Sequence, residues 1–419
     1  SNMGWGLIDT STVISSFTIR NGSSLSGGPF GHGGGLHINH QSSPLLENLL
    51  ITDNTGGHGG GMFVVNGSSP LIRNVVIKDN IGSEGGGIAF MAGGSPKLEN
   101  VLIHNNTAGS FGGGIYCGAQ HMSLTNVTIT ENSSNAVGGS IYFAYQNFDD
   151  SDERPIITNS IFWDNSPQEF YIYDPAGEVE GSFEISYSNI ENGQDSIVVD
   201  GSSEPVWGSG NIDVDPMFVD TANGDYTLQM DSPLIDAGHP DSTDADGTIA
   251  DIGAYYYDQS GQPARVQGFV TTPTDSSEIF LSWDALSPEP DHYAIYRSTD
   301  MNADFYSLNP HISSVAGNAI TIIDDNQVTE DITYYYRIRG IAAEGDEGLL
   351  ALLKHGRIGS DSTSLYMQDA FLTHTTGTGL DAGSSYTLEA FVRFPAFPTD
   401  PINFIIFGGD FLQLVPLEN

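Results

Sequence analysis

Residues 48–65 read NLLITDNTGGHGGGMFVV, and residues 74–91 read NVVIKDNIGSEGGGIAFM. The two stretches share an apolar run, an Asp-Asn pair and three successive glycines, and they begin at equivalent positions, Asn48 and Asn74. Residues 100–117, NVLIHNNTAGSFGGGIYC, repeat the pattern at the same spacing with a small variation. A fixed period in this range is typical of a solenoid, in which each repeat forms one coil.

Three marker positions carry the period through the first part of the chain. The first glycine of the triplet recurs with spacings of 26, 26, 27 and 26, at Gly33, Gly59, Gly85, Gly112 and Gly138. Two asparagine positions recur with a constant spacing of 26, at Asn48, Asn74, Asn100 and Asn126 and at Asn54, Asn80, Asn106 and Asn132. After an insertion, Asn159 and Asn165 continue both columns.

The segments between the markers have the length and composition of short strands. They are separated by Gly, Asn and Ser-Pro, so each repeat is expected to supply three strands of one β-helix coil. Because side chains alternate along a strand, Leu49 and Ile51 should point inward, together with Met62 and Val64. The Asn54 column should then form an internal ladder in which each amide bonds to the next coil.

The Gly-Gly-Gly and Asp-Asn repeats resemble the GGA[ILV] and FxxN repeats of polymorphic outer-membrane proteins and, more broadly, pectin-lyase-like β-helix proteins. Three later stretches are similar to the closing coils of such proteins, namely residues 211–218, 232–238 and 250–255. The resemblance implies a right-handed parallel β-helix over residues 1–258. It does not imply one activity, because the superfamily contains lyases, hydrolases, epimerases, adhesins and inert stalks.

Two further β-rich regions follow the predicted linker at residues 261–263. Residues 262–358 contain alternating strands with an early Trp283 and a late run of tyrosines, and they resemble a fibronectin type III domain. Residues 359–419 resemble the opening strands of a laminin-G or concanavalin-like sandwich, which so short a segment cannot complete. The predicted fold class is therefore all-β, a β-helix followed by a β-sandwich and part of a second one.

Composition limits the possible partners. The chain has 12 Lys and Arg against 53 Asp and Glu, a net charge of -41, which repels nucleic acids and anionic membranes. The apolar runs are too short for a transmembrane helix, and the single cysteine, Cys117, cannot form an internal disulfide. The start Ser1-Asn2-Met3 has the form of an expression remnant. We expect a monomeric bacterial protein that is secreted or displayed on the cell surface.

Outward-facing aromatic residues predict a platform for a polysaccharide or a cell-surface glycan. The alternative is ordinary stabilisation between neighbouring strands. The candidate binding residues are Phe63, Tyr116 and Tyr142, extended by Tyr145 and Phe148, with Trp163 in a second outward column.

Charged residues provide weaker candidates for catalysis. Asp53 and Asp79 should lie one coil apart, near the carboxylate spacing of retaining glycosidases, and Lys78 could act as the base of a lyase. The insertion at residues 144–155 adds Asp149, Asp150 and Arg154, and functional loops of solenoids lie at such insertions. The alternative is a solvated turn whose acids are imposed by the repeat.

Asp244, Asp246 and Asp251 suggest a calcium site, because oxygen ligands alternate before a glycine and a later aspartate. The alternative is an acidic turn that closes the helix. No other cofactor is expected.

Taken together, the sequence favours a glycan-binding, adhesin-like or structural protein. A polysaccharide-active lyase or glycoside hydrolase and an inert surface stalk remain as alternatives.

Overall fold

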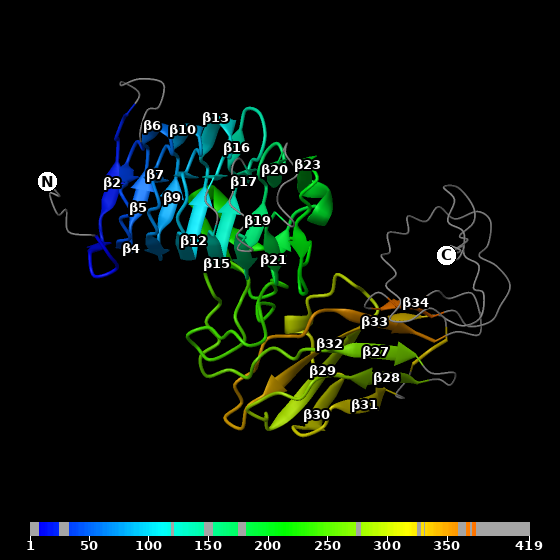
Figure 1. Cartoon of the computed structure of the whole chain (residues 1–419). Coiled ribbons are helices and arrows are strands. Elements are labelled where there is room, and N and C mark those ends of the chain that lie inside the picture. Colours follow the sequence, from blue (N-terminus) through cyan, green and yellow to red (C-terminus); the bar gives the residue numbers. More distant parts are fainter. Residues whose placement is uncertain are drawn as a thin grey trace, which may run out of the picture. The chain divides into compact units, whose positions relative to one another are not determined.

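The computed structural model describes residues 8–24, 33–118, 121–145, 154–174, 182–273, 278–324, 328–330, 332–358, 366–368 and 371–373. The chain divides into two compact units, Ser1–Gly261 and Gln262–Asn419 (Figure 1). Three candidate residues, Phe148, Asp149 and Asp150, lie outside the described residues, as does most of the predicted laminin-G-like segment. Among the described residues, no helix has the length and apolar character needed to cross a membrane.

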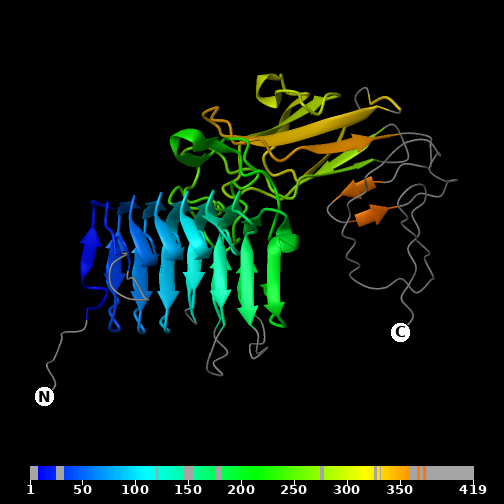
Figure 2. The ribbon, with the colours of Figure 1, turned by 90° about the horizontal axis from the view of Figure 1, so that it is seen from above.

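The first unit is a right-handed parallel β-helix, as predicted. One coil consists of β8 (Leu71–Arg73), β9 (Val76–Lys78), β10 (Ile81–Glu84) and β11 (Ile88–Met91), and each strand pairs in parallel with its equivalents in the neighbouring coils. Figure 2 shows the strands of successive coils side by side and running the same way. The coils thus form three sheets, A, B and C.

The sheets are built from the following strands. Sheet A contains β1 (Val13–Ser15), β2 (Thr18–Arg20), β4 (Leu45–Glu47), β5 (Leu50–Thr52), β8, β9, β12 (Lys97–His104), β15 (Ser123–Thr130), β18 (Ile156–Thr158), β19 (Ile161–Trp163), β21 (Glu184–Ser186), β22 (Asn189–Ile190) and β24 (Val206–Trp207). Sheet B contains β6 (Thr55–His58), β10, β13 (Thr107–Phe111) and β16 (Ser133–Ser134). Sheet C contains β3 (Leu36–Ile38), β7 (Met62–Val65), β11, β14 (Ile115–Cys117), β17 (Ile141–Ala144), β20 (Phe170–Asp174) and β23 (Ile197–Gly201).

The core consists of stacked columns of equivalent aliphatic side chains. The predicted inward positions are confirmed: Leu49, Ile51, Met62 and Val64 are all at most 3% exposed. Cys117 is a buried member of the same core. Each such side chain contributes about 1.5–3 kcal/mol when fully removed from water, so the coils are held together mainly by this continuous interior.

The predicted asparagine ladder is confirmed. The Nδ2 group of Asn54 donates to Oδ1 of Asn80 at 2.9 Å, and the same contact links Asn80 to Asn106 and Asn106 to Asn132 at 2.9 Å, then Asn132 to Asn165 at 3.0 Å. Each Oδ1 also accepts the backbone N–H of the preceding asparagine. Asn54, Asn80, Asn106 and Asn132 are at most 1% exposed, so these hydrogen bonds satisfy polar groups that water does not reach.

The glycine triplets line the corner next to this ladder. Gly59 has a φ of 63°, a conformation that glycine adopts without strain. A Cβ atom on Gly60 would lie 2.3 Å from the carbonyl oxygen of Gly86 in the next coil, and one on Gly61 would lie 3.0 Å from Nδ2 of Asn80. Successive coils therefore approach too closely for a side chain at Gly60 and Gly61.

The predicted closing coils are only partly correct. Ile212 makes a parallel bridge to Asn189, so the stretch at residues 211–218 does begin one more turn. The later stretches instead lie on the outer face of sheet A. The backbone N–H of Ala254 donates to Oγ1 of Thr128 at 2.9 Å, and that of Gly253 donates to the carbonyl of Asn159 at 2.9 Å. We call residues 215–257 the covering segment.

The covering segment cannot continue the helix because its strands pair with each other. It contains the antiparallel pair β25 (Phe218–Asp220) and β26 (Asp225–Leu228), joined by the 3-10 helix η2 (Thr221–Asn223). Another 3-10 helix, η1 (Gly193–Ser196), precedes β23.

The second unit contains two antiparallel sheets over a core that includes Trp283, Tyr293 and Tyr336. One sheet has the order β27 (Val270–Pro273), β28 (Ile279–Ser282), β31 (Thr321–Asp324). The other has the order β30 (Ile312–Ala316), β29 (His292–Ser298), β32 (Thr333–Ile341), β33 (Lys354–Arg357). The 3-10 helix η3 (Phe305–Ser307) and the pair β34 (Tyr366–Gln368) and β35 (Phe371–Thr373) complete the described elements. The fibronectin type III-like assignment stays a prediction.

Replacement of one ladder residue should measurably destabilise the first unit. Asn80→Leu leaves the backbone N–H of Asn54 without its acceptor and removes the side-chain hydrogen bonds of Asn80 with Asn54 and Asn106, at a cost of roughly 1–3 kcal/mol in the free energy of unfolding. Urea unfolding measures this loss, with Ser83→Ala on the exposed surface of the same coil as control. An unchanged free energy in Asn80→Leu would show that the ladder does not stabilise the fold.

Candidate functional site

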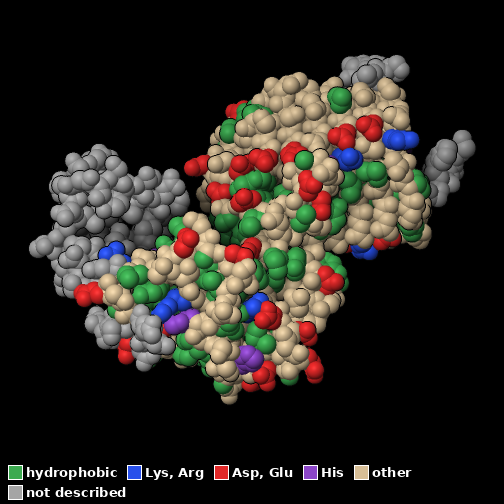
Figure 3. All heavy atoms as spheres, turned by 180° about the vertical axis from the view of Figure 1, so that it is seen from behind, with side chains coloured by type: hydrophobic (Ala, Val, Ile, Leu, Met, Phe, Trp, Pro, Cys, Tyr) green, Lys and Arg blue, Asp and Glu red, His purple; other side chains and the backbone are tan. Residues whose placement is uncertain are grey.

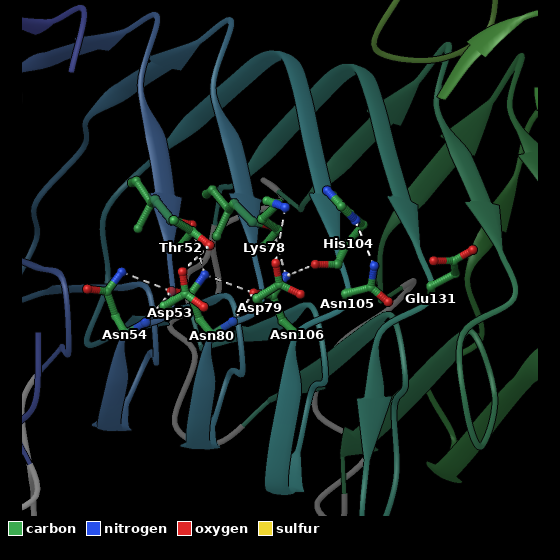
Figure 4. A network of polar contacts seen from close by, with 12 residues as sticks. Thr52, Asp53, Asn54, Lys78, Asp79, Asn80, His104, Asn105, Asn106 and Glu131 are labelled. Atoms are coloured by element: carbon green, nitrogen blue, oxygen red, sulfur yellow. Dashed lines mark hydrogen bonds and ion pairs between the residues drawn. The ribbon is translucent and has the colours of Figure 1, made fainter. Parts of the chain in front are cut away.

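Two side-chain columns run along the edge of sheet A where the predicted catalytic residues lie. Thr52, Lys78, His104 and Thr130 occupy equivalent positions on successive strands, and Trp163 continues the column on β19. The neighbouring turn column holds Asp53, Asp79, Asn105, Glu131 and Asp164. Figure 4 shows both columns beside the asparagine ladder.

The acids of the turn column have a backbone explanation. Asp53, Asp79 and Glu131 have φ values of 56°, 54° and 54°, and Asn105 and Asp164 share this left-handed conformation. Asp and Asn tolerate it better than most residues, which accounts for every residue of this column except Glu131. The recurrence of acids in this column therefore does not by itself indicate catalysis, which agrees with the solvated-turn alternative.

Lys78 forms an ion pair with Asp79, its neighbour in the sequence. Lys78 Nζ lies 3.2 Å from Asp79 Oδ2, and the two side chains are 35% and 42% exposed. Asp53 in the preceding coil accepts a hydrogen bond from Thr52 Oγ1 at 3.1 Å. The lysine is thus paired with its neighbouring carboxylate, and this pair is accessible to solvent.

His104, next to Lys78, is enclosed by the covering segment. It is 3% exposed, and its Nδ1 lies 3.0 Å from Asn105 Nδ2 and 3.1 Å from the hydroxyl of Tyr226. Since the amide nitrogen can only donate, Nδ1 is the acceptor and the proton resides on Nε2. Burial, and next the charge of Lys78, lower the pKa of His104 to about 4, so the ring is neutral near pH 7.

Tyr226 is a contact that the sequence did not predict. Its hydroxyl donates to Glu131 Oε2 at 2.8 Å, and its ring lies 4.6 Å from that of His104. Burial and the bond to Glu131 raise its pKa above the ordinary value. Tyr226 and His104 are 122 positions apart with no repeat relating them, so no sequence signal pairs them. These contacts anchor the covering segment and shield His104 from a polymeric substrate.

Loss of the Tyr226 hydroxyl should loosen the covering segment. Tyr226→Phe removes the hydrogen bond to Glu131 and leaves a half-buried carboxylate without it, which should cost about 1–3 kcal/mol. Hydrogen exchange of the backbone amides of Gly253 and Ala254 reports the opening locally. Tyr256→Phe, at a tyrosine that is 43% exposed, is the matched control, and equal exchange in both variants would contradict the anchoring role.

A second candidate site lies on the outer face of sheet C. Tyr116, Tyr142 and Tyr171 are in register on β14, β17 and β20. The rings of Tyr116 and Tyr142 are stacked with centroids 5.3 Å apart, and those of Tyr142 and Tyr171 with centroids 5.6 Å apart and planes within 7° of parallel. Phe111 and Tyr173 also stack on Tyr142. We call these five residues the aromatic stack.

The stacking decides what this surface offers to a ligand. Because the rings of Tyr116 and Tyr171 cover the two faces of the Tyr142 ring, Tyr142 is only 6% exposed although it points away from the core. The stack therefore presents ring edges and hydroxyls along its length, and ring faces only at its ends. This corrects the expectation of a row of open aromatic faces.

The other predicted aromatic residues are not part of this stack. Phe63 is 6% exposed, and its ring stacks on those of His37 and His58 with centroids 5.2 and 5.4 Å apart. Tyr145 is 4% exposed, belongs to the core and donates its hydroxyl proton to the carbonyl of Ser182, so its prediction as an extension of the platform is wrong. Trp163 is half-buried on sheet A.

Arg154 is half-buried just before β18, near enough to Tyr145 for its charge to act on that phenol. It does not come from the same strands as Lys78 and Asp79. Among the described catalytic candidates, Lys78 and Asp79 are neighbours in the sequence and form an ion pair, and the fold places Asp53 at the equivalent turn position one coil away.

The proposed calcium ligands are used by the backbone of the covering segment. The two carboxylate oxygens of Asp251 accept the N–H groups of Asp236 and Tyr257, both at 2.7 Å. Asp244 accepts the N–H of Asp251 at 2.7 Å, and Asp246 accepts that of Gln259 at 2.7 Å. This is the acidic turn that the sequence allowed as the alternative. Among the described residues, no group of three or more His, Cys, Asp or Glu side chains is arranged to hold a metal ion.

Burial gives two of these carboxyls unusual proton affinities. It raises the pKa of Asp251 to about 8 and that of Asp244 to about 6, against the opposing effect of their backbone hydrogen bonds. A carboxyl with a raised pKa in the folded state holds its proton where the unfolded chain has lost it. Stability therefore falls as the pH rises from the unfolded pKa through the folded one.

The first unit should lose stability toward alkaline pH. The Asp251 contribution declines from its ordinary pKa of 3.8 up to its folded pKa of about 8. His104, with a pKa lowered from 6.5 to about 4, acts in the opposite sense below pH 6.5. The net decline should therefore be clearest between about pH 6.5 and pH 8.

Urea unfolding at several pH values measures this decline. Asp251→Asn should have a flatter profile in the same window, because its amide does not titrate. If the decline persists unchanged in Asp251→Asn, another group causes it.

Acidic side chains outnumber basic ones on the exposed surface. Figure 3 shows many Asp and Glu and few Lys and Arg side chains on the visible face. Two of the cations of the β-helix are engaged in ion pairs, Lys78 with Asp79 at 3.2 Å and Arg73 with Glu99 at 2.8 Å. An anionic polymer would therefore meet a repulsive field.

Comparisons with known proteins agree with the β-helix. The family model described as a right handed beta helix region matches residues 7–205. A comparison with curated proteins gives no match.

Two solved structures are similar over parts of the chain. An Fn3-like protein from Clostridium thermocellum is 22% identical over 23% of this chain and 92% of that chain, with a TM-score of 0.19. The spore cortex lytic enzyme SleM from Clostridium perfringens is 10% identical over 58% of this chain and 68% of that chain, with a TM-score of 0.18. At such TM-scores the assignment of the fold rests on the family match and on the strand pairing.

Proposed function

We propose that the β-helix binds a neutral glycan at the aromatic stack on sheet C, as part of a protein that is secreted or displayed on the cell surface. The observation that carries this proposal is the run of in-register rings from Tyr116 to Tyr171. Aromatic rings and phenolic hydroxyls offer the combined apolar and polar contacts that sugars require. The alternative of an inert stalk gives this aromatic surface no role.

Charge restricts the class of glycan. The net charge of -41 repels polyuronates and sulfated polymers at low ionic strength. The spacing of the rings, 5.3 and 5.6 Å between centroids, follows the rise from one coil to the next. An extended neutral polysaccharide running parallel to the helix axis advances by a similar distance per sugar, so successive sugars could meet successive coils.

The second unit supports the same context. Its two antiparallel sheets have three and four strands, the numbers expected of a fibronectin type III-like sandwich. We propose that it acts as a spacer that presents the β-helix.

Calcium binding at Asp244, Asp246 and Asp251 also remains a proposal. An ion there would have to replace the backbone N–H groups that these carboxylates accept. Its binding would be visible as a rise in melting temperature with millimolar Ca²⁺ relative to chelator.

Binding should depend on the aromatic stack and not on Lys78. In isothermal titration against cello-, xylo-, manno- and galacto-oligosaccharides of four to six sugars, Tyr116→Ala and Tyr142→Ala should each weaken binding by about tenfold, because each removes a ring edge and a phenolic hydroxyl that would contact the sugar. Lys78→Ala and Asp79→Asn should leave the dissociation constant unchanged. Unaltered melting temperatures would separate lost binding from lost folding.

The enzyme alternative predicts a different result in the same experiment. The accessible Lys78–Asp79 pair at 3.2 Å is the observation in its favour. Cleavage of any of these oligosaccharides, or of polygalacturonate, that is abolished by Lys78→Ala or Asp79→Asn would replace the binding model. If the protein binds none of these oligosaccharides, the glycan-binding model is also contradicted.

A further inference from the structure

The first unit contains four Asn-Gly pairs, and the asparagine of each pair is exposed. The pairs are Asn21-Gly22, Asn66-Gly67, Asn192-Gly193 and Asn223-Gly224. Such a pair is chemically labile because the glycine nitrogen, unhindered by a side chain, can attack the amide carbon of the asparagine. The attack requires that nitrogen to give up any hydrogen bond that it donates, so the fold decides which pair reacts.

The asparagine ladder opposes this attack at Asn21, which lies one coil before Asp53 of the turn column. The backbone N–H of Gly22 donates to Oδ1 of Asn54 at 2.9 Å. The same kind of bond holds the residue after the turn in each following coil, as far as Asn132. A nitrogen held in this way would have to lose a hydrogen bond before it could react.

Backbone hydrogen bonds hold two more of the glycine nitrogens. The N–H of Gly67 donates to the carbonyl of Ala92 in the next coil at 3.0 Å. The N–H of Gly224 donates to the carbonyl of Thr221 at 2.9 Å, within the turn that joins β25 and β26. In three of the four pairs, therefore, the attacking nitrogen is already engaged.

The pair Asn192-Gly193 lies just beyond the last coil of the ladder. Asn192 is one coil after Asp164, so Gly193 takes the place of a ladder asparagine. Among the described residues, none accepts the N–H of Gly193, and the side chain of Asn192 makes no capping bond. A Cβ on Gly193 would meet no atom within 4 Å, so there is room for a ring to close. The exposed Asp195 donates its N–H to the carbonyl of Asn192 at 3.1 Å, but this bond leaves the nitrogen of Gly193 available.

We infer that Asn192 is a site of spontaneous deamidation, which the fold selects from the four Asn-Gly pairs. The nitrogen of Gly193 loses its proton to hydroxide and forms a bond to Cγ of Asn192. The Cγ–Nδ2 bond breaks, and the leaving nitrogen takes a proton from water to depart as ammonia, which leaves a succinimide. Water then opens the ring, at the side-chain carbonyl to give aspartate or at the main-chain carbonyl to give isoaspartate. The inference does not depend on the proposed glycan binding.

The product alters the last turn of the β-helix. Isoaspartate lengthens the main chain by a methylene group four residues before β23, which pairs with β20. It also adds a negative charge beside Glu191, whose Oε2 accepts the backbone N–H of Asp164 at 2.9 Å. Hydrogen exchange of the β23 amides should therefore become faster as the protein ages.

The test incubates the full chain at neutral pH and physiological temperature, and mass spectrometry of proteolytic peptides follows each Asn-Gly pair. Asn192 should convert roughly tenfold faster than Asn21, the factor by which one net hydrogen bond shifts an equilibrium. Labelling by an isoaspartyl methyltransferase distinguishes isoaspartate from aspartate. Asn21 is the matched internal control, because it is also exposed and has a φ of 58° against 60° at Asn192.

The chain unfolded in guanidinium chloride is the second control, because its four pairs should react at similar rates once the hydrogen bonds are lost. If Asn21, Asn66 or Asn223 reacts as fast as Asn192 in the folded protein, the inference is wrong. It is equally wrong if Asn192 persists in the folded protein while the unfolded chain reacts. Asn54→Ala removes the acceptor of the Gly22 N–H and should bring the rate at Asn21 closer to that at Asn192. If this variant does not fold, the comparison of the four pairs in the parent chain decides alone.

Discussion

The amide-to-amide hydrogen bond between successive coils is the constraint on which the rest of the β-helix depends. It fixes Asn80 against Asn106 at 2.9 Å in an interior without water, where an unmade bond is costly. The neighbouring glycine corner follows from it, because a Cβ on Gly61 would lie 3.0 Å from the ladder amide. The aliphatic columns then stack in register. The position of every outward side chain, including the tyrosines of sheet C, is set by this interior alignment.

The sequence predicted those parts of the structure that repeat. The constant period places Asn54, Asn80 and Asn106 in one column, and alternation along the strands correctly assigns Leu49 and Ile51 to the core. Tyr171 was missed because the coil that contains it is longer: it lies 29 positions after Tyr142, so counting by the usual period does not reach it. Tyr145 was placed outside because the insertion obscures where the strand ends.

Contacts between segments without a common period were not predictable. Nothing in residues 215–257 indicates that Tyr226 reaches His104 or that Ala254 binds Thr128, since these pairings depend on the three-dimensional path of the covering segment. The sequence also does not show how the rings within one column are oriented. Register places Tyr116 beside Tyr142, but only side-chain torsions decide whether the rings lie flat on the sheet or stack face to face.

The ladder has a direction: every Nδ2 group points toward the following coil and every Oδ1 toward the preceding one. It stops where the next equivalent position is Gly193, and there Asn165 donates instead to the buried carboxyl of Glu169 at 2.8 Å. The bond between Asn132 and Asn165 keeps a length of 3.0 Å although 33 positions separate the two residues, more than in the regular coils. Each coil of the ladder thus offers the same Oδ1 acceptor to the preceding coil and the same Nδ2 donor to the following one, whatever loop it carries. Gene duplication or deletion of whole coils can change the length of such a protein, and new loops can arise on any coil, without redesign of either end.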